Sequence, residues 1–437
     1  MTAAVLHVHQ DRCLAQARES ICGGRRKVLL VGPTGVGKTV LFSRIAVGHV
    51  ERGGVVLVVV HRRELLKQAA GRLRREGIDR VGIILSGETR DLDASVIVAS
   101  IGTLLAMQKR GEPLPAASLV IFDEAHHFVA DEWSKIADVY GGSLLIGVTA
   151  TPERSDGTPL GDLFEELIVI ASMRELIAGG FLVQPRVIAP AKRRRTPNES
   201  PVEAYRKHAT GRRAVVFLRS VAESEATAAD FTAAGIPAAS VDGELNSEVR
   251  EQRLEAFARG ELSVICNVFC LTEGWDCPPA DCAILARGFG HVGPYLQAVG
   301  RVLRTSPGKT EAIILDLLGA VHSHGLPDDD REFSLDGKAI GGGDAPTKVC
   351  RGCGATIMLS ARVCPHCNEA FGGANHPEDL FEELRPVSQA TLEASYWDEQ
   401  VKIARQRGYQ LGWAAHRFEE KFGRFPRKFW REAKAAA

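Results

Sequence analysis

The stretch GPTGVGKT, residues 32 to 39, combines residue types suited to binding phosphate groups. It follows the apolar run KVLLV at residues 27 to 31, which has the composition of a buried strand. Glycines let backbone N–H groups curl around phosphate oxygens, and the lysine can reach the terminal phosphates of a nucleotide. The threonine hydroxyl can ligate Mg²⁺. The pattern therefore predicts a phosphate-binding loop made of Pro33, Thr34, Gly35, Val36, Gly37, Lys38 and Thr39.

A second reactive stretch is VIFDEAHHF, residues 120 to 128, in which an apolar strand ends in two carboxylates. The carboxyl ends of parallel strands open into a ligand crevice, where such charges are tolerated. Asp123 is expected to hold Mg²⁺, and Glu124 to orient and deprotonate the water that attacks a γ-phosphate. A capped, exposed turn is the alternative for this stretch alone, but its occurrence together with GPTGVGKT favours the catalytic interpretation.

The elements that must position these residues form two series of short apolar runs. The first series covers residues 27–31, 55–60, 96–99, 119–122 and 144–148, and the second covers residues 214–218, 263–268, 282–286 and 311–315. Helix-like segments alternate with them, which is typical of parallel sheets in α/β domains. We place a first domain at residues 1–190, a linker at 191–202 that overlaps APAKRRRTPNES (residues 189–200), and a second domain at 203–330.

Composition limits the classes of protein that fit. The chain has 437 residues, 45 % hydrophobic, with 54 basic and 54 acidic residues. Any basic surface must therefore be local. The longest aliphatic run, residues 55–60, is too short to cross a bilayer, and the first residues lack a signal-peptide pattern. We expect a cytoplasmic protein without a membrane partner.

A cysteine cluster follows the second domain, in CRGCGATIMLSARVCPHC at residues 350 to 367. Two C-x₂-C knuckles can supply four thiolates to a tetrahedral Zn²⁺. The closed ligand set indicates a structural site in a zinc ribbon at residues 346–371, and two disulfides are the alternative. The expected ligands are Cys350, Cys353, Cys364 and Cys367.

Residues 372–437 form an acidic linker and a basic, aromatic, helical tail. Residues 401 to 437 hold ten Lys or Arg and three acidic residues, interleaved with Tyr409, Trp413, Phe418 and four further aromatic residues. Such a mixture suits phosphate contact and base stacking. A small helical cap, with the aromatic residues packed as a core against the rest of the chain, explains the pattern equally well.

Eight motifs in order give the chain a resemblance to a known family: GPTGVGKT, VVVHRREL, VASIGTL, DEAH, TATP, VFLRS, LTEGWDCP and QAVGRVLR. Over residues 6 to 320 it resembles the superfamily 2 helicases and translocases, in the DEAH-like branch of XPB-type helicases and restriction-enzyme motor subunits. The resemblance implies two tandem RecA-like domains with ATP between them. The zinc ribbon and the tail GWAAHRFEEKFGRFP are similar to the ends of phage and prophage helicases.

The resemblance also assigns roles to further residues. Gln10 would read adenine, and Gly274 and Asp276 would approach the nucleotide. Gln297, Arg301 and Arg304 would lie on one helix, with both guanidinium groups reaching the γ-phosphate across the cleft. Nucleotide state would be coupled to the second domain by His126, Thr149 and Thr151. A nucleic-acid strand would be contacted by Arg62, Thr103 and Thr272.

These implications lead to one expected function and two alternatives. The expected function is an ATP- and Mg²⁺-dependent helicase that moves on nucleic acid and unwinds it, with DNA favoured over RNA. One alternative is a duplex-DNA translocase subunit of a restriction or repair complex. The other is a zinc-ribbon binding protein whose ATPase switches its affinity. Replication, repair or restriction proteins are the expected partners.

Overall fold

The computed structural model describes most of the chain. The described residues are 6–88, 91–127, 131–152, 160–190, 194, 196–197, 199–268, 270–271, 274–336, 347–350, 352–353, 355–358 and 363–370, and in the tail 397, 400–401, 404–405, 409–422, 424–426 and 430. They divide into two compact units, residues 1–369 and 370–437. None of the described helices is both long and apolar enough to cross a membrane.

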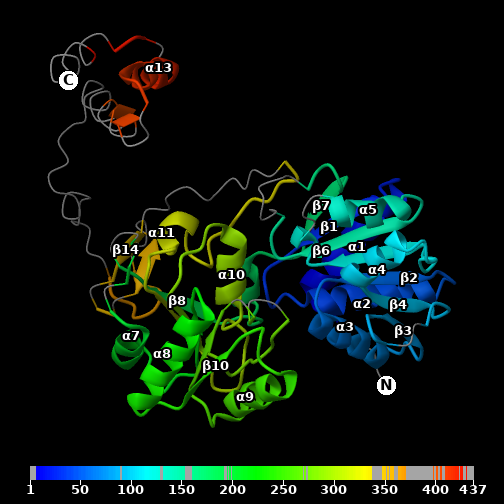
Figure 1. Ribbon diagram of the computed structural model, residues 1–437, viewed down its shortest axis with the longest axis horizontal. Helices are drawn as coiled ribbons and strands as arrows, with labels where there is room; N and C mark the ends of the chain where they lie inside the picture. The colour runs from blue at the N-terminus through cyan, green and yellow to red at the C-terminus, as the bar shows by residue number, and fades with distance from the viewer. Residues whose placement is uncertain are drawn as a thin grey trace. The chain divides into compact units, whose positions relative to one another are not determined.

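The first domain is built on a seven-stranded sheet in the order β3-β4-β2-β5-β6-β1-β7 (Figure 1). All its paired strands run parallel. The strands are β1 (Lys27–Val31), β2 (Val56–Val60), β3 (Val81–Ile84), β4 (Val96–Ser100), β5 (Leu119–Asp123), β6 (Leu144–Thr149) and β7 (Glu166–Val169). The five strands predicted from apolar runs all form, within one residue at each end, whereas β3 and β7 were not predicted.

Helices cover both faces of this sheet. They are α1 (Val8–Cys22), α2 (Lys38–Val50), α3 (Arg63–Arg75), α4 (Ile101–Lys109), α5 (Asp131–Val139), α6 (Met173–Ala178) and the short 3₁₀ turn η1 (Ala125–His127). Alternate residues of one strand enter different cores: Val28 and Leu30 of β1 pack with α1, α2 and α3, and Leu29 and Val31 pack with α4 and α5. The period of two in a strand therefore produces two apolar layers around one sheet.

The second sheet has the order β10-β11-β9-β12-β13-β8-β15-β14 in the described part of the chain. Its strands are β8 (Gln184–Ile188), β9 (Ala214–Phe217), β10 (Ala238–Val241), β11 (Val264–Asn267), β12 (Cys282–Leu285), β13 (Glu311–Asp316), β14 (Thr347–Val349) and β15 (Thr356–Met358). The predicted boundary at residue 190 is wrong, because β8 pairs in parallel with β13 and so belongs to the second sheet. Two sheets of this kind are the tandem RecA-like architecture that the sequence predicted.

The second domain carries α7 (Pro201–His208), α8 (Val221–Ala233), α9 (Ser247–Arg259), α10 (Val292–Gly300) and α11 (Val321–His324). Ser200 caps α7 through a capping box with Glu203, which starts the helix inside the predicted linker at 191–202. Beyond α11 the chain returns to the first domain, where Phe333 and Leu335 pack against its core. Two segments of the chain, residues 181–184 and 326–336, therefore join the domains.

The β14–β15 hairpin, which has Cys350 and Cys353 between its two strands, extends the second sheet. Thr356 of β15 pairs antiparallel with Val187 of β8, and the Arg186 guanidinium donates to the carbonyl of Cys353. The predicted zinc ribbon is thus an edge of the second domain. In the second unit, α13 (Leu411–Phe422) contributes to a core whose described members are tail residues. A core packed against the rest of the chain, one of the two alternatives for the tail, stays a prediction.

Candidate active site

The phosphate-binding loop connects β1 to α2, as predicted. Gly35 and Gly37 have φ angles of 96° and 83°, in the left-handed region that favours glycine. Helix α2 begins at Lys38, directly after Gly37, so its free N–H groups and positive dipole end point into the loop. The local sequence therefore forms an anion-binding site at the start of α2.

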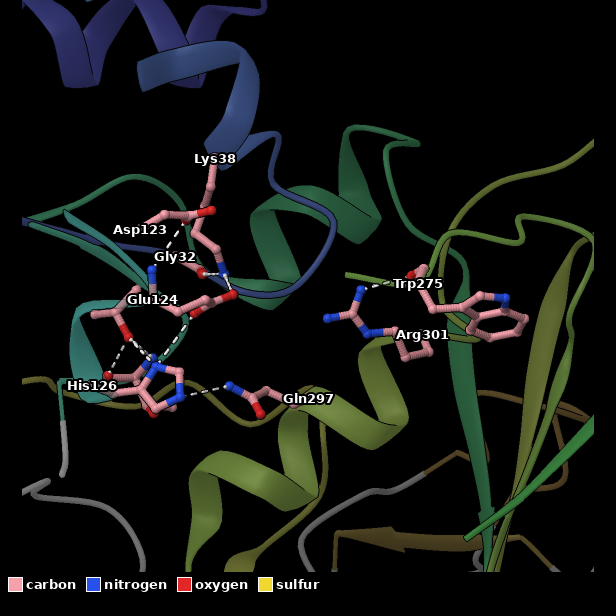
Figure 2. A network of polar contacts seen from close by, with 10 residues as sticks. Gly32, Lys38, Asp123, Glu124, His126, Trp275, Gln297 and Arg301 are labelled. Carbon is pink, nitrogen blue, oxygen red and sulfur yellow. Dashed lines mark hydrogen bonds and ion pairs between the residues drawn. The ribbon is translucent and has the colours of Figure 1, made fainter. Parts of the chain in front are cut away.

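Lys38 lies at the centre of this site. Its Nζ atom is 3.5 Å from the carbonyl oxygen of Gly32 and 3.7 Å from Oε1 of Glu124 (Figure 2). Its side chain is 11 % exposed, and a positive charge in such a position is weakly screened. The ammonium group is therefore held between the loop and the carboxylates at the end of β5.

The predicted catalytic carboxylates occupy the end of β5 and the turn after it. Glu124 has a φ of 51°, which is uncommon for a residue with a side chain and is a feature of functional sites. Its backbone N–H donates to Oδ1 of Asp123 at 3.1 Å, and both residues are 7 % exposed. The strained turn directs both carboxylates into the same crevice as Lys38.

A polar chain leads from Glu124 to the second domain. His126 Nδ1 lies 3.3 Å from Glu124 Oε2 and 3.1 Å from the hydroxyl of Thr149, and its Nε2 is 3.3 Å from Nε2 of Gln297 on α10 (Figure 2). The Thr149 hydroxyl also donates to the carbonyl of Thr151. All three predicted coupling residues therefore meet at the interface, and Gln297 extends their network across it.

Arg301 and Arg304 form the opposite wall of the crevice. The predicted helix that was to carry both is wrong, because α10 ends at Gly300, Arg301 is its C-cap, and Arg304 lies in a bridge with Leu182. The two guanidinium groups still converge, since both donate to the carbonyl of Trp275, at 2.8 and 3.4 Å. Arg304 also pairs with Asp276. A bend after the helix brings the charges together.

The two walls enclose one cleft of about 430 Å³. Its lining joins the phosphate loop and the β5 carboxylates of one domain to the 274–278 segment and the arginines of the other. Most residues predicted to bind the nucleotide contribute to it, whereas Gln10, Pro33 and Val36 are not part of its lining. The lining includes Thr34, Gly35, Gly37, Lys38, Thr39, Asp123, Glu124, Gly274, Asp276, Arg301 and Arg304.

Gln10 lies behind the phosphate loop. Its side-chain amide donates to the carbonyl of Val36 at 3.1 Å and accepts from the backbone N–H of His7 at 3.0 Å, so the residue braces the loop. The His7 ring packs on Phe181 with ring centroids 4.5 Å apart, and Phe181 reaches the cleft lining. The role of Gln10 in reading adenine stays a prediction.

Several residues at the interface between the two domains were not predicted from the sequence. A Cβ atom added to Gly300 would lie 2.6 Å from Cβ of Thr34, and one added to Gly293 would lie 2.9 Å from the Thr151 hydroxyl. Seven residues separate these glycines, so both lie on the face of α10 that approaches the first domain. The Gln68 side chain also donates to the carbonyl of Gly274 at 2.6 Å. Only the position of Gly300 within QAVGRVLR could have indicated its role.

Lys309, also missed, supports the segment that carries Asp276. Its ammonium donates to the carbonyls of Pro278 and Ala280 at 2.9 and 2.6 Å. Burial lowers the pKa of Lys309 to about 8, opposed by the nearby charge of Asp281. A half-buried cation that donates to two carbonyls holds the loop that forms one edge of the cleft.

The predicted nucleic-acid contacts have different surroundings. Arg62 precedes α3 and lines a cavity of about 700 Å³ between the domains, with Arg63 and Lys67. Thr103 lies in α4 and is only 8 % exposed, so its hydroxyl is not a surface group. Thr272 lies outside the described residues. Of the two described members of this set, Arg62 is the accessible one.

The four predicted zinc ligands lie together. Cys350 and Cys367 have sulfur atoms 3.5 Å apart, and those of Cys353 and Cys364 are 3.7 Å apart. All four sulfur atoms lie within 4.8 Å of one another, and all four cysteines are free thiols. Four sulfurs bound tetrahedrally at 2.3 Å would be about 3.8 Å apart, so the cluster has the size that zinc requires.

Comparison with known proteins places this geometry in a family. Residues 4–154 match the family described as the res subunit of type III restriction enzymes, and residues 198–306 match the helicase conserved C-terminal domain. These matches cover both walls of the cleft. The chain belongs to the superfamily 2 helicases and translocases. Relatives of the chain are named ATP-dependent helicases, and the prediction that the chain is an ATP hydrolase is confirmed.

Individual relatives of this superfamily 2 chain come from viruses and cells. A 51.5 kDa protein of a Lactococcus phage is 29 % identical, with 94 % of this chain and 88 % of the phage protein covered. The DNA 3'-5' translocase XPB2 of Sulfurisphaera tokodaii is 24 % identical over 67 % of this chain and 78 % of its own length. Other relatives are longer, and the chain covers 57 % of irc3 of Schizosaccharomyces pombe.

Solved structures share the fold of this superfamily 2 chain. A fragment of an HsdR subunit of a type I restriction enzyme from Vibrio vulnificus has a TM-score of 0.58 at 22 % identity, covering 77 % of this chain and 71 % of that one. The type ISP restriction-modification enzyme LlaBIII, bound to DNA, gives 0.55 at 19 % identity, covering 72 % of this chain and 27 % of that one. At these identities the likeness establishes the fold.

Proposed function

We propose that this chain is a DNA helicase that couples ATP hydrolysis to movement along DNA and to strand separation. The observation that carries the proposal is the cleft itself: Lys38 and Glu124 of one domain face Arg301 and Arg304 of the other across about 430 Å³. A reaction centre divided between two domains changes whenever the domains move, which is what a motor requires.

Each wall supplies a different part of the chemistry. ATP bound with Mg²⁺ would supply the phosphoryl group that is transferred to water. Thr39 and Asp123 have the oxygen ligands that Mg²⁺ prefers, and they line the same cleft. Glu124 would orient and deprotonate the attacking water. Lys38, Arg301 and Arg304 would balance the charge that develops on the phosphoryl oxygens.

The network from Glu124 through His126 to Gln297 would report the nucleotide state to the second domain. Gln297 contacts His126 only while α10 lies against the first domain, because the two residues belong to different domains. Movement of α10 would therefore break this contact and withdraw the neighbouring Arg301 at the same time. Arg62 lines the adjacent cavity between the domains and would contact a strand bound there.

The relatives support DNA as the track. XPB2 is named a DNA 3'-5' translocase, and LlaBIII was solved on DNA. The match to the res subunit of type III restriction enzymes favours a second candidate, a translocase that moves on duplex DNA without separating it and acts with a restriction or repair partner. Both candidates use the same cleft and differ in what the movement does to the duplex.

We also propose that the four-cysteine cluster holds Zn²⁺ as a structural centre. The sulfur spacing fits the ion, and four thiolates leave no open coordination position for catalysis. The hairpin pairs with β8, a strand that follows one of the two connections between the domains. Zinc would therefore stabilise the edge of the second sheet near this connection.

ATP turnover measured in parallel with single-stranded DNA, duplex DNA and RNA tests the proposal, together with a strand-displacement assay. A helicase shows turnover stimulated by single-stranded DNA and ATP-dependent displacement, and a duplex translocase shows stimulation by duplex DNA without displacement. The Lys38→Ala protein is the matched control, because it should lose turnover under every condition. Turnover that no nucleic acid stimulates would reject both motors and leave an ATP-dependent binding switch.

A further inference from the structure

The C-terminal tail folds around its own core. Trp397, Phe418 and Ala414 are buried, at 3 %, 1 % and 0 % exposure, and Trp430 packs against them from the end of the chain. Among the residues that the structure describes, the members of this cluster belong to the tail. Packing therefore explains Trp397 and Phe418 and part of the surface of Trp413, whereas the exposed Tyr409 needs a different explanation.

A second set of side chains lies along α13 and just before it; the helix is drawn in red in Figure 1. Trp413 and Arg417 are four residues apart in α13, so they share one face, and Tyr409 lies two residues before the helix begins. Ala414, Ala415 and Phe418 are buried on the other face, and Trp413, which is partly buried, also packs against that core. The rings of Tyr409 and Trp413 have centroids 5.2 Å apart, and the Arg417 guanidinium lies 5.9 Å from the Trp413 ring. We call these three residues the stacking ladder.

The stacking ladder is unusual in its exposure. Tyr409 is 47 % exposed, and of the exposed large hydrophobic side chains in the described residues, the two aromatic ones, Tyr409 and Phe425, both lie in the tail. A solvent-exposed aromatic ring beside an arginine is not stabilised by burial in a core. It is, however, the arrangement that offers a flat surface to a base and a positive charge to a phosphate.

The basic residues of the tail are concentrated in the part of the sequence that holds the stacking ladder. Residues 401 to 437 hold ten Lys or Arg and three acidic residues, whereas residues 370 to 400 of the same compact unit hold one arginine and seven acidic residues. A positive field attracts a phosphate backbone, and a partly exposed ring pair accepts unpaired bases, whereas stacked bases within a duplex are not available to it. The combination therefore favours single-stranded nucleic acid over a duplex.

We infer that the tail is a single-strand-binding module, in which Tyr409 and Trp413 stack on bases and Arg417 contacts the adjacent phosphate. None of these three residues belongs to the lining of the ATP cleft, and the inference does not rest on the chain being a motor. The module binds without nucleotide and with little sequence preference, since every base offers a π-face.

Photocrosslinking tests the contact directly in the full-length protein. The probe is oligodeoxythymidine carrying 5-bromodeoxyuridine, irradiated without ATP, and the crosslinked peptides are identified by mass spectrometry. We expect crosslinks at Tyr409 or Trp413. Crosslinks confined to residues 1–336 overturn the inference.

Affinity measurements with matched variants give a second test. Tyr409→Ala should weaken binding of oligodeoxythymidine about fivefold, a value at the low end for losing one stacked base, and Tyr409→Phe should bind normally. Arg417→Gln should reduce the slope of log affinity against log salt by about 0.7. The control Arg110→Gln removes an exposed arginine that pairs with Glu112 in the first domain and should leave the slope unchanged.

Three results would contradict the stacking ladder. The first is equal loss of affinity in Arg110→Gln and Arg417→Gln, which would indicate a diffuse charge effect. The second is duplex DNA bound as tightly as the single strand. The third is a change of oligomeric state in Tyr409→Ala without loss of affinity for the oligonucleotide, which would make this face a contact between protein chains. Unchanged circular dichroism of each variant excludes unfolding as the cause.

Discussion

Replacing Gly300 by alanine tests whether hydrolysis depends on close approach of the two walls. Gly300 is the last residue of α10, directly before Arg301. The new methyl carbon would lie 2.6 Å from Cβ of Thr34 in the phosphate loop. Because Cβ of Thr34 is fixed to the backbone, the contact cannot be relieved by rotating a side chain, and the end of α10 must move away.

The magnitude follows from ordinary contact distances. Carbon atoms prefer separations of about 3.5 to 4.0 Å, so the shift required is about 1 Å. A misplacement of about 1 Å can reduce a rate on the order of a hundredfold. Since about 1.4 kcal/mol corresponds to a factor of ten, this equals roughly 2.7 kcal/mol of lost transition-state stabilisation. Arg301 should carry the loss, because it follows Gly300 directly.

Steady-state ATP turnover with saturating single-stranded DNA measures the effect, and a fluorescent nucleotide titration measures binding. We expect kcat of Gly300→Ala to fall about a hundredfold with nucleotide affinity nearly unchanged, because the phosphate-binding loop keeps its backbone donors. Gly71→Ala is the matched control: Gly71 also lies in a helix, α3, but an added methyl group there meets nothing within 4 Å. Wild-type kcat for Gly300→Ala would refute the reasoning.

Three further predictions concern the same molecule. Glu124→Gln should bind ATP and hold DNA but turn over at least a hundredfold more slowly, as a filter-binding assay with ATP and a turnover assay would show; normal turnover would exclude Glu124 as the base. Gln297→Leu should keep basal turnover and lose most of its stimulation by DNA, because it removes the contact with His126, and unchanged stimulation would exclude that coupling path. Metal analysis should find stoichiometric zinc in the wild-type chain and much less zinc in Cys364→Ser, and the Cys364→Ser protein should melt at a lower temperature. Equal zinc contents in the two proteins would argue against the cysteine site.

The strands and the residues at their ends could be predicted because local sequence determines them. A run such as KVLLV is apolar on both faces and therefore forms a central strand, and a glycine-rich loop after it leaves Lys38 at the start of a helix. The same local logic placed Asp123 and Glu124 at the end of β5. Such residues reach the cleft through their own element, and the neighbouring domain is not needed to place them.

The remaining features depend on contacts between distant segments. Strand β8 alternates apolar and polar residues weakly, and only its pairing with β13 assigns it to the second sheet. Helix α10 ends at Gly300, directly before Arg301, although QAVGRVLR has no proline or other helix-breaking residue after Gly300. The bend therefore reflects packing of this segment against Leu182 and Trp275. To predict the interface role of Gly293, one must know that Thr151 lies opposite it, and no local sequence pattern gives that information.

The central claim is that ATP is hydrolysed between two domains, with Lys38 on one wall and Arg304 on the other. The most direct measurement compares DNA-stimulated ATP turnover and nucleotide affinity in the wild type, Lys38→Ala and Arg304→Ala. The account predicts that both variants lose most turnover, and that Arg304→Ala still binds ATP because the phosphate-binding loop is intact. Wild-type turnover in Arg304→Ala would contradict it.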